Sequence, residues 1–430
     1  MVNNDWLVHW ILRLRQHGLY QVLQKSLMLL FPFVLVGSLS QVIQLTVLNR
    51  DSFLATIFNW STWLGKHQFL AIIFNHLTGL TLGIVAALAA FSMARYTAKY
   101  YARDEQLAGL TGLLAYLMLA VRYTANNELT FTQGMLGMGG LFMGLLVGYL
   151  VGFAFKKLAH QQRQTPVLAE ATLSRTLDSI GAIILVLSIA VLLSLLLNWL
   201  AISVLPDQVI LKLQSVNANQ ATLPFTLGVT LLASVLTFFG LTSMPTLAQF
   251  GRDGIATNAN LNYALAHHSI WNVPYPFSLG TLYEPFGAIG GTGGTLALII
   301  AIFLFSHQTN QHLISRWSLL PVLFNFNSTV LVGLPILGNG LYLIPFLLVP
   351  LVNMGVAALA IAWHLIPAVV YNVPLGTPSL LQAFVGTNGN WGALVVVLLN
   401  IVIGVLIYRP FVQCANRLNE QGGGRDVKND

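Results

Sequence analysis

Uncharged hydrogen-bonding side chains gather in one stretch of the C-terminal half of the chain. Residues 324–329 read FNFNST and place Asn325, Asn327 and Ser328 in a region, Trp317 to Tyr408, that contains no Lys, Arg, Asp or Glu. Amides and hydroxyls hydrogen-bond without carrying charge, which suits the hydroxyls of a saccharide. The pattern therefore indicates a sugar site. The alternative that stays open is a set of structural hydrogen bonds between helices.

Two other stretches interrupt apolar segments with Gly, Pro, Thr and Asn. GAIGGTGGT at residues 287–295 runs into an apolar helix, and VPLGTPSLLQAFVGTNGNW at residues 373–391 precedes the last one. Backbone broken at membrane depth must face protein or water, and several such breaks together indicate a solute site. For the Gly/Thr run, close packing of helices is the alternative. The candidate ligand contacts in the two stretches are Gly291, Thr292, Gly293, Thr387, Asn388, Asn390 and Trp391.

Glu284 is the only acidic residue between Asp253 and Glu420. A lone acid near a membrane cavity is a functional candidate. Its neighbour Pro285 permits a second interpretation, in which Glu284 stands at the start of a helix and is favoured there by the helix dipole. The sequence leaves both interpretations open.

The amino-acid composition indicates whether water or a lipid bilayer surrounds the helices that carry these residues. The chain is 56% hydrophobic and 8% charged, with a mean hydropathy of +0.73, whereas about a quarter of the residues of a soluble domain are charged. Thirteen acids and twenty Lys or Arg cannot cover a soluble surface of this length. We therefore predict an all-α polytopic membrane protein. The single Cys414 excludes an intrachain disulfide framework and a multi-Cys metal site.

The distribution of basic residues predicts the orientation in the membrane. Apolar stretches of roughly the 20 residues that a span needs lie near residues 27–47, 69–92, 107–121, 134–154, 179–204, 222–242 and 392–408. With a cytoplasmic N-terminus, ten Lys or Arg of the first half fall in inside loops and four in outside loops. Basic residues favour the cytoplasmic side. This topology accounts for the net charge of +7 without nucleic acid.

The second half of the chain also resembles a known family. Residues 258–298, 318–353 and 373–391 are similar, in order and spacing, to the membrane component (enzyme IIC) of phosphotransferase-system sugar permeases of the lactose/cellobiose (diacetylchitobiose) class. The resemblance implies about ten transmembrane helices of ordinary span length, re-entrant hairpins and elevator-type movement. It also implies a homodimer, a disaccharide ligand and a cytoplasmic IIB protein that phosphorylates the sugar.

On this basis the chain divides into four parts. Residues 1–26 form an amphipathic segment, residues 27–205 an N-terminal membrane domain for dimerisation, and residues 206–410 a C-terminal sugar-binding domain. Residues 411–430 form a polar cytoplasmic tail, which is expected to be disordered from Asn416 onwards. The expected location is the bacterial inner membrane, with the lipid bilayer as the surrounding partner.

The departures from the family pattern fall on its ionisable positions. Where members read FNINEP, this chain has Ser328 at the position of the acid, and where members read Gly-Ile-His-Gly it has Gly240 to Ser243, with Thr242 in place of the histidine. The TGGDW motif has become residues 387–391, TNGNW. Thr242 and Ser243 are therefore further candidate ligand contacts.

Three functions compete on this evidence. Phosphoryl transfer to a sugar needs a group that orients a hydroxyl and takes its proton, which Ser and Thr do poorly. The first interpretation is thus a sugar sensor or receptor, which signals through an output module and has no catalytic residue. The second is a working disaccharide permease in which Glu284, or a substrate-specific arrangement of other residues, replaces the lost groups. The third is a non-binding structural membrane protein. We expect no metal, no organic cofactor and no nucleic-acid partner.

Overall fold

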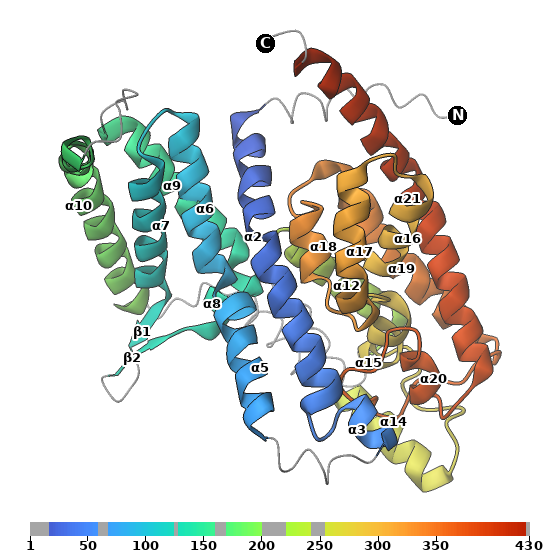
Figure 1. The fold of residues 1–430 in the computed structure, drawn as a ribbon. Helices are drawn as coiled ribbons and strands as arrows, with labels where there is room; N and C mark the ends of the chain where they lie inside the picture. The colour runs from blue at the N-terminus through green and yellow to red at the C-terminus, as the bar shows by residue number, and fades with distance from the viewer. Residues whose placement is uncertain are drawn as a thin grey trace.

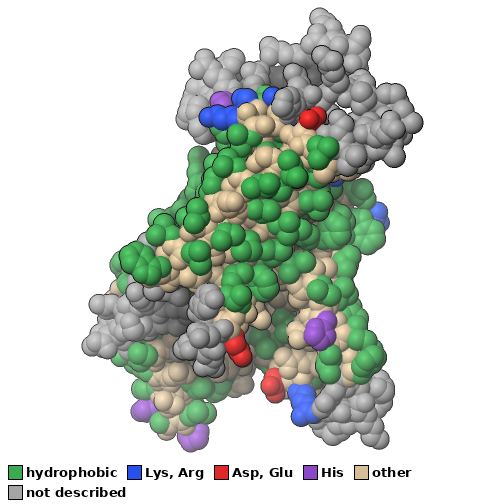
Figure 2. Space-filling model, turned by 90° about the vertical axis from the view of Figure 1, so that its left-hand side faces the viewer, with side chains coloured by type: hydrophobic (Ala, Val, Ile, Leu, Met, Phe, Trp, Pro, Cys, Tyr) green, Lys and Arg blue, Asp and Glu red, His purple; other side chains and the backbone are tan. Residues whose placement is uncertain are grey.

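Helices make up almost all of the described chain in the computed structural model (Figure 1). The structure describes residues 17–58, 68–123, 128–159, 169–199, 221–241 and 254–426. Six helical stretches of this part are long and apolar enough to cross a membrane, and α7, α12 and α16 are shorter apolar helices. Hydrophobic side chains cover the middle of one face, and Lys and Arg lie toward its ends (Figure 2).

Most helices of the first half of the chain build a unit on one side of α2, whereas α3 lies on its other side (Figure 1). A short antiparallel hairpin, with Val121 opposite Phe131, joins two of its helices. The elements are α2 (Gly18–Ile43), η1 (Gln44–Leu48), α3 (Phe53–Phe58), α5 (Gln68–Thr81), η2 (Leu82–Ile84), α6 (Val85–Tyr100), α7 (Glu105–Ala120), β1 (Val121–Tyr123), β2 (Leu129–Phe131), α8 (Gln133–Leu136), η3 (Met138–Gly140), α9 (Leu141–Leu158) and α10 (Ala169–Trp199).

Small residues bring α6 and α9 into close contact. Gly144, Gly148 and Gly152 recur every fourth position of α9 and so lie on one face. A Cβ placed on Gly148 would lie 2.4 Å from the carbonyl oxygen of Ala90 in α6. The two backbones therefore approach as closely as small residues allow, which is how membrane helices commonly associate.

Replacing Gly148 by Val is expected to destabilise this unit by about 1–3 kcal/mol, the usual cost of overpacking. Gly181→Val in α10 is the matched control, because a Cβ at Gly181 meets nothing within 4 Å. The midpoint of thermal unfolding in detergent measures the difference. Equal midpoints for the two variants would contradict the proposed packing of α6 on α9.

The second half of the chain forms the other unit, in which most helices are short or interrupted (Figure 1). Its elements are α12 (Leu223–Phe238), α14 (Ile255–His267), α15 (Leu279–Leu282), η5 (Tyr283–Gly287), α16 (Thr295–Phe305), α17 (Thr309–Leu323), α18 (Ser328–Gly333), α19 (Gly340–Ala362), α20 (Gln382–Gly386) and α21 (Trp391–Asp426).

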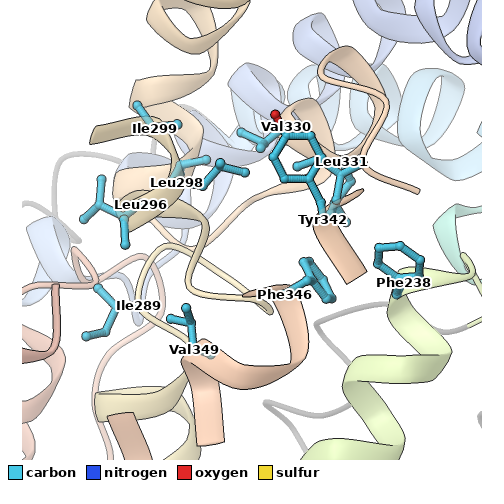
Figure 3. Packing of buried hydrophobic residues seen from close by; sticks show 14 of the residues in the cluster. Phe238, Ile289, Leu296, Leu298, Ile299, Val330, Leu331, Tyr342, Phe346 and Val349 are labelled. Carbon is cyan, nitrogen blue, oxygen red and sulfur yellow. The ribbon is translucent and has the colours of Figure 1, made fainter. Parts of the chain in front are cut away.

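A buried apolar core surrounds the interruptions. Figure 3 shows side chains of α16, α18 and α19 packed around the loop that carries Ile289. Phe238, at the end of α12, lies beside Phe346 of α19 with 5.6 Å between ring centroids. This packing fixes the broken segments in place, because their backbone has little regular structure to hold it.

The two units also meet through the backbone. Ser52 and Leu375 form a parallel bridge, in which the amide of Phe53 donates to the carbonyl of Leu375 at 2.9 Å. Gly376 has φ +71°, and a Cβ there would lie 2.7 Å from the carbonyl oxygen of Leu45. The loop that follows α19 is therefore seated against the end of the first long helical stretch.

The helices overlap the apolar ranges predicted from the sequence, with corrections at both ends of the chain. The first helix of the described residues begins at Gly18 rather than at residue 27, so residues 18–26 join the span predicted at 27–47. At the other end α21 continues through Asp426, whereas the sequence predicted disorder from Asn416. The side chain of Asn416 donates to the carbonyl of Phe305 at 2.8 Å, and Leu418 is buried. These contacts stabilise the helix as far as Leu418, the end of the last candidate span.

Candidate functional site

The candidate sugar contacts lie on three broken segments, which we define as residues 283–295, 324–329 and 373–391. The first includes η5 and the Gly/Thr loop before α16, the second connects α17 to α18, and the third contains α20. The sequence places them far apart, and the fold brings them together in the second unit (Figure 1). Side-chain hydrogen bonds, rather than regular secondary structure, join them.

Asn325 and Asn327 join the first two broken segments. The Oδ1 atom of Asn325 accepts from the amide of Gly290 at 2.8 Å, and Nδ2 of Asn327 donates to the carbonyl of Thr292 at 2.9 Å. Both side chains are buried. Asn325 has φ +67°, a left-handed conformation that Asn tolerates better than most residues. The structural interpretation of the FNFNST motif is therefore correct for these two bonds.

The Gly/Thr loop is held from two sides. Gly291 has φ +106°, and a Cβ there would lie 2.6 Å from Cγ of Asn327. The hydroxyls of Thr292 and Tyr283 are 2.9 Å apart, and the hydroxyl of Tyr408 in α21 donates to the carbonyl of Gly293 at 2.6 Å. Glycine is needed at residue 291 both for its backbone conformation and for the close approach of Asn327.

The third segment contacts both of the others. The amide of Ser379 donates to the carbonyl of Leu323 at 2.7 Å, next to the second segment. Nε2 of Gln382 donates to Oε1 of Glu284 in the first segment at 3.2 Å. Gln382 is buried, whereas Glu284 is only partly buried. The carboxylate of Glu284 is thus held at the junction of the segments.

Four buried polar atoms of these segments have no hydrogen-bond partner among the described residues. They are Nδ2 of Asn325, Oγ1 of Thr329, Oγ of Ser379 and Oε1 of Gln382. Leaving a buried donor or acceptor unpaired costs about 1–3 kcal/mol, so such atoms call for a partner. We call Glu284, Asn325, Ser379 and Gln382 the polar cluster. Its side chains carry an amide donor, a hydroxyl, an amide acceptor and a carboxylate, which are groups that hydrogen-bond with sugar hydroxyls.

Glu284 itself lies in a π-helical turn, η5. Such turns are rare and occur often at functional sites. The turn does not lie at the start of a long helix, because the Gly/Thr loop separates it from α16. The interpretation of Glu284 as a helix-start residue therefore loses its basis.

Other predicted contacts serve the chain's own backbone. Oγ1 of Thr387 donates to the carbonyl of Ala383 at 2.7 Å, and Oδ1 of Asn390 accepts from the amide of Ala393 at 3.1 Å, capping α21. Asn388 is exposed with φ +55°. These side chains shape the turn between α20 and α21.

The remaining predicted contacts differ in position. The ring of Trp391 is 71% exposed and lies against Phe384, with 5.0 Å between centroids. Ser328 is the first residue of α18 and is half-buried, one position after Asn327. Thr242 and Ser243 lie outside the described residues.

Sequence reasoning missed Ser379 and Gln382. Both occur in SLLQAF, the apolar part of the third segment, where the only signal was two polar residues in an uncharged stretch. Tyr283, adjacent to Glu284, was missed as well. Its pairing with Thr292 needs the turn of η5, which the sequence did not predict.

Comparisons with known proteins agree with this architecture. Residues 24–350 match the family model described as "Phosphotransferase system, EIIC". A cellobiose-specific EIIC component of Lactococcus lactis subsp. lactis is 30% identical, over 90% of this chain and 82% of its own length. An oligo-beta-mannoside-specific EIIC component of Bacillus subtilis is 24% identical, over 95% of this chain and 92% of its own length.

One solved structure also aligns. The transporter ChbC, the IIC component from the N,N'-diacetylchitobiose-specific phosphotransferase system, covers 95% of this chain at 21% identity with a TM-score of 0.42. That score is too low to match individual helices. The family model and the curated relatives confirm the family that the sequence motifs indicated. This multi-pass membrane chain belongs to the EIIC family of the phosphotransferase system.

Proposed function

We propose that this chain is the translocating subunit for a β-linked disaccharide and that Glu284 provides the carboxylate that the FNFNST motif lacks. The hydrogen bond between Glu284 and Gln382, beside the three unpartnered buried atoms of the polar cluster, carries the proposal. A sugar hydroxyl can donate to the carboxylate while its oxygen accepts from the amide of Asn325. Relatives named for cellobiose and oligo-beta-mannoside support a β-linked substrate.

Glu284 also supplies a proton acceptor, and the lack of one at the family positions was the reason for the sensor interpretation. A carboxylate orients a sugar hydroxyl and takes its proton when the phosphoryl group arrives. The phosphoryl donor in this proposal is a cytoplasmic IIB protein. A homodimer, a cytoplasmic N-terminus, elevator-type movement and a bacterial inner-membrane location remain parts of the proposal that stem from the family resemblance and the loop charges.

The sensor function is the second candidate, and Ser328 favours it. The acid of the family motif is absent at that position, next to Asn327, which holds the Gly/Thr loop. In this version Glu284 binds the sugar without promoting transfer, and a signalling output module replaces the IIB protein. The translocating subunit and the sensor would both bind the sugar at the polar cluster. They differ in whether a phosphoryl group is transferred to that sugar.

A binding experiment with the purified full chain in detergent tests the shared site. We expect calorimetry to show saturable binding of cellobiose or mannobiose and weak binding of the α-linked maltose. Ser379→Ala is expected to weaken binding about fivefold to tenfold, the value of one hydrogen bond. Ser38→Ala is the matched control, because Ser38 is also buried with an unpartnered hydroxyl but lies in α2, in the other unit.

The outcomes separate the three functions. Sugar phosphate formed in the presence of a phosphorylated IIB protein, detected by mass spectrometry, supports the translocating subunit. Binding without product supports the sensor. The absence of binding by every saccharide would leave the structural interpretation. Equal weakening by Ser379→Ala and Ser38→Ala would remove the polar cluster as the site.

A test based on Asn327→Ala is less informative. Its Nδ2 atom holds the carbonyl of Thr292, so the substitution loosens the Gly/Thr loop whether or not the side chain contacts a sugar. Ser379 is preferable because its hydroxyl makes no hydrogen bond within the described residues.

A further inference from the structure

Basic side chains gather where two membrane spans of the first unit end. The spans Phe69–Tyr100 and Met138–Leu158 end at the same side of this unit (Figure 1). Around their ends lie Arg95, Lys99, Arg103, Lys156 and Lys157, which we call the cationic cluster. The cationic cluster lies where the two apolar spans end, and this level corresponds to the headgroup layer of a bilayer.

The acidic residues nearby are already engaged. Oδ1 of Asp104 accepts from two backbone amides and caps α7. Glu105 pairs with Arg95 at 3.1 Å and with Lys99 at 3.3 Å. No carboxylate among the described residues pairs with Arg103, Lys156 or Lys157.

These three cations are positioned by their own contacts. The guanidinium of Arg103 donates to the carbonyl of Lys156 at 3.1 Å, and its buried Nη1 has no hydrogen-bond partner among the described residues. Nζ of Lys156 stands 4.0 Å from the ring centroid of Tyr101, and Nζ of Lys157 stands 5.2 Å from that of Phe153. Cation–π contacts and the backbone bond keep the three groups together at the end of α9.

An apolar stripe on α9 leads to this end. Phe142, Leu146, Tyr149, Leu150 and Phe153 follow helical spacing and therefore share one side of the helix. Leu146 is 41% exposed and Leu150 is 56% exposed, and the rings of Tyr149 and Phe153 stack with 6.4 Å between centroids. The stripe thus offers an acyl chain an open apolar surface below the cations.

We infer that this place binds one anionic phospholipid, with its phosphate at Arg103, Lys156 and Lys157 and an acyl chain along the apolar stripe. Basic pockets between membrane helices bind anionic headgroups, and each Lys or Arg near the surface contributes an attraction of about 1 kcal/mol. A lipid with a negatively charged headgroup complements both features. Its headgroup pairs with the three cations that have no carboxylate partner, and its acyl chain covers the apolar stripe. A small soluble anion would use only the cations.

The test uses the purified full chain in detergent and measures bound lipid by native mass spectrometry. Dioleoylphosphatidylglycerol is titrated against dioleoylphosphatidylcholine. We expect the phosphatidylglycerol affinity of Lys156→Gln/Lys157→Gln to fall roughly thirtyfold, from about 1 kcal/mol per lysine. Arg316→Gln/Arg409→Gln is the matched control, because it removes two exposed cations from the other unit. It is expected to retain wild-type affinity.

A second pair of variants tests the apolar part. Leu150→Asn is expected to weaken phosphatidylglycerol binding severalfold, whereas Leu406→Asn, at a residue 57% exposed on α21, is expected to leave it unchanged. Should the double lysine variant fail to elute as a single species, Lys157→Gln alone replaces it, with a roughly fivefold loss expected from about 1 kcal/mol.

Three results would overturn the proposal. The first is equal binding of the two lipids, and the second is an equal loss in the control variants. The third is displacement of phosphatidylglycerol by millimolar inorganic phosphate, which would assign the cations to a soluble anion. A change from dimer to monomer in the lysine variants, without any lipid bound to wild type, would instead make this face a contact between two copies.

Discussion

Replacing Gly291 by Ala is expected to lower saccharide affinity by at least about thirtyfold. The residue has φ +106°, and its new Cβ would lie 2.6 Å from Cγ of Asn327. Backbone strain of this kind costs about 1–3 kcal/mol. Moving Asn327 aside would also weaken its hydrogen bond to Thr292, worth about 1 kcal/mol. The first and second broken segments would then lose one of the two side-chain hydrogen bonds that join them.

Calorimetry with the preferred disaccharide and the midpoint of thermal unfolding measure these effects. Gly355→Ala is the control, since a Cβ at Gly355 in α19 meets nothing within 4 Å. Alanine in a helix interior is favoured over glycine by about 1 kcal/mol, so this variant is expected to unfold at the same temperature or slightly higher. Wild-type affinity in Gly291→Ala would show that the Gly/Thr loop does not position the site.

Replacing Glu284 by Gln is expected to slow phosphoryl transfer by roughly 10²–10⁴, the usual contribution of a group that accepts a proton. Binding is expected to weaken less than about tenfold, because the amide still hydrogen-bonds with a sugar hydroxyl. The readout is sugar phosphate formed per unit time at saturating disaccharide with a phosphorylated IIB protein. Glu420→Gln, at an exposed position of α21, controls for loss of one negative charge.

A second variant makes this prediction sharper. Adding Ser328→Glu to Glu284→Gln restores a carboxylate at the position where the family motif has its acid, and we expect transfer to recover in part. Transfer at the wild-type rate in Glu284→Gln would exclude Glu284 as the proton acceptor. No transfer in the wild-type chain, with binding intact, would favour the sensor.

The sequence predicted the positions of the helix interruptions better than the roles of the residues in them. Gly and Pro marked the Gly/Thr loop and the segment around α20, since clusters of these residues disfavour regular helix. Asn325 and Asn327 were assigned to the ligand. Each side chain also hydrogen-bonds with backbone 35 positions away. Such a partner depends on how separate segments meet in space, and no local pattern contains that information.

The polar cluster shows the same limit. Glu284 was recognised because a lone acid in an apolar region is conspicuous in any sequence. Ser379 and Gln382 were overlooked, because ordinary polar residues become significant only when burial leaves their atoms without partners. The continuation of α21 was missed for a related reason. At the start of this continuation, Asn416 contacts Phe305, more than a hundred positions earlier.

The bridge between Ser52 and Leu375 bears on how the chain matures. The two bridged residues are separated by most of the sequence. The amide of Phe53 therefore cannot bond to the carbonyl of Leu375 until the chain has been made and inserted through that residue. Domains are generally completed in order during synthesis, and contacts between distant residues form late because closing a long loop costs entropy. The contact between residues 52 and 375 is therefore among the last to form. A chain truncated before Leu375 would leave the backbone of the first unit at residues 52 and 53 without this contact.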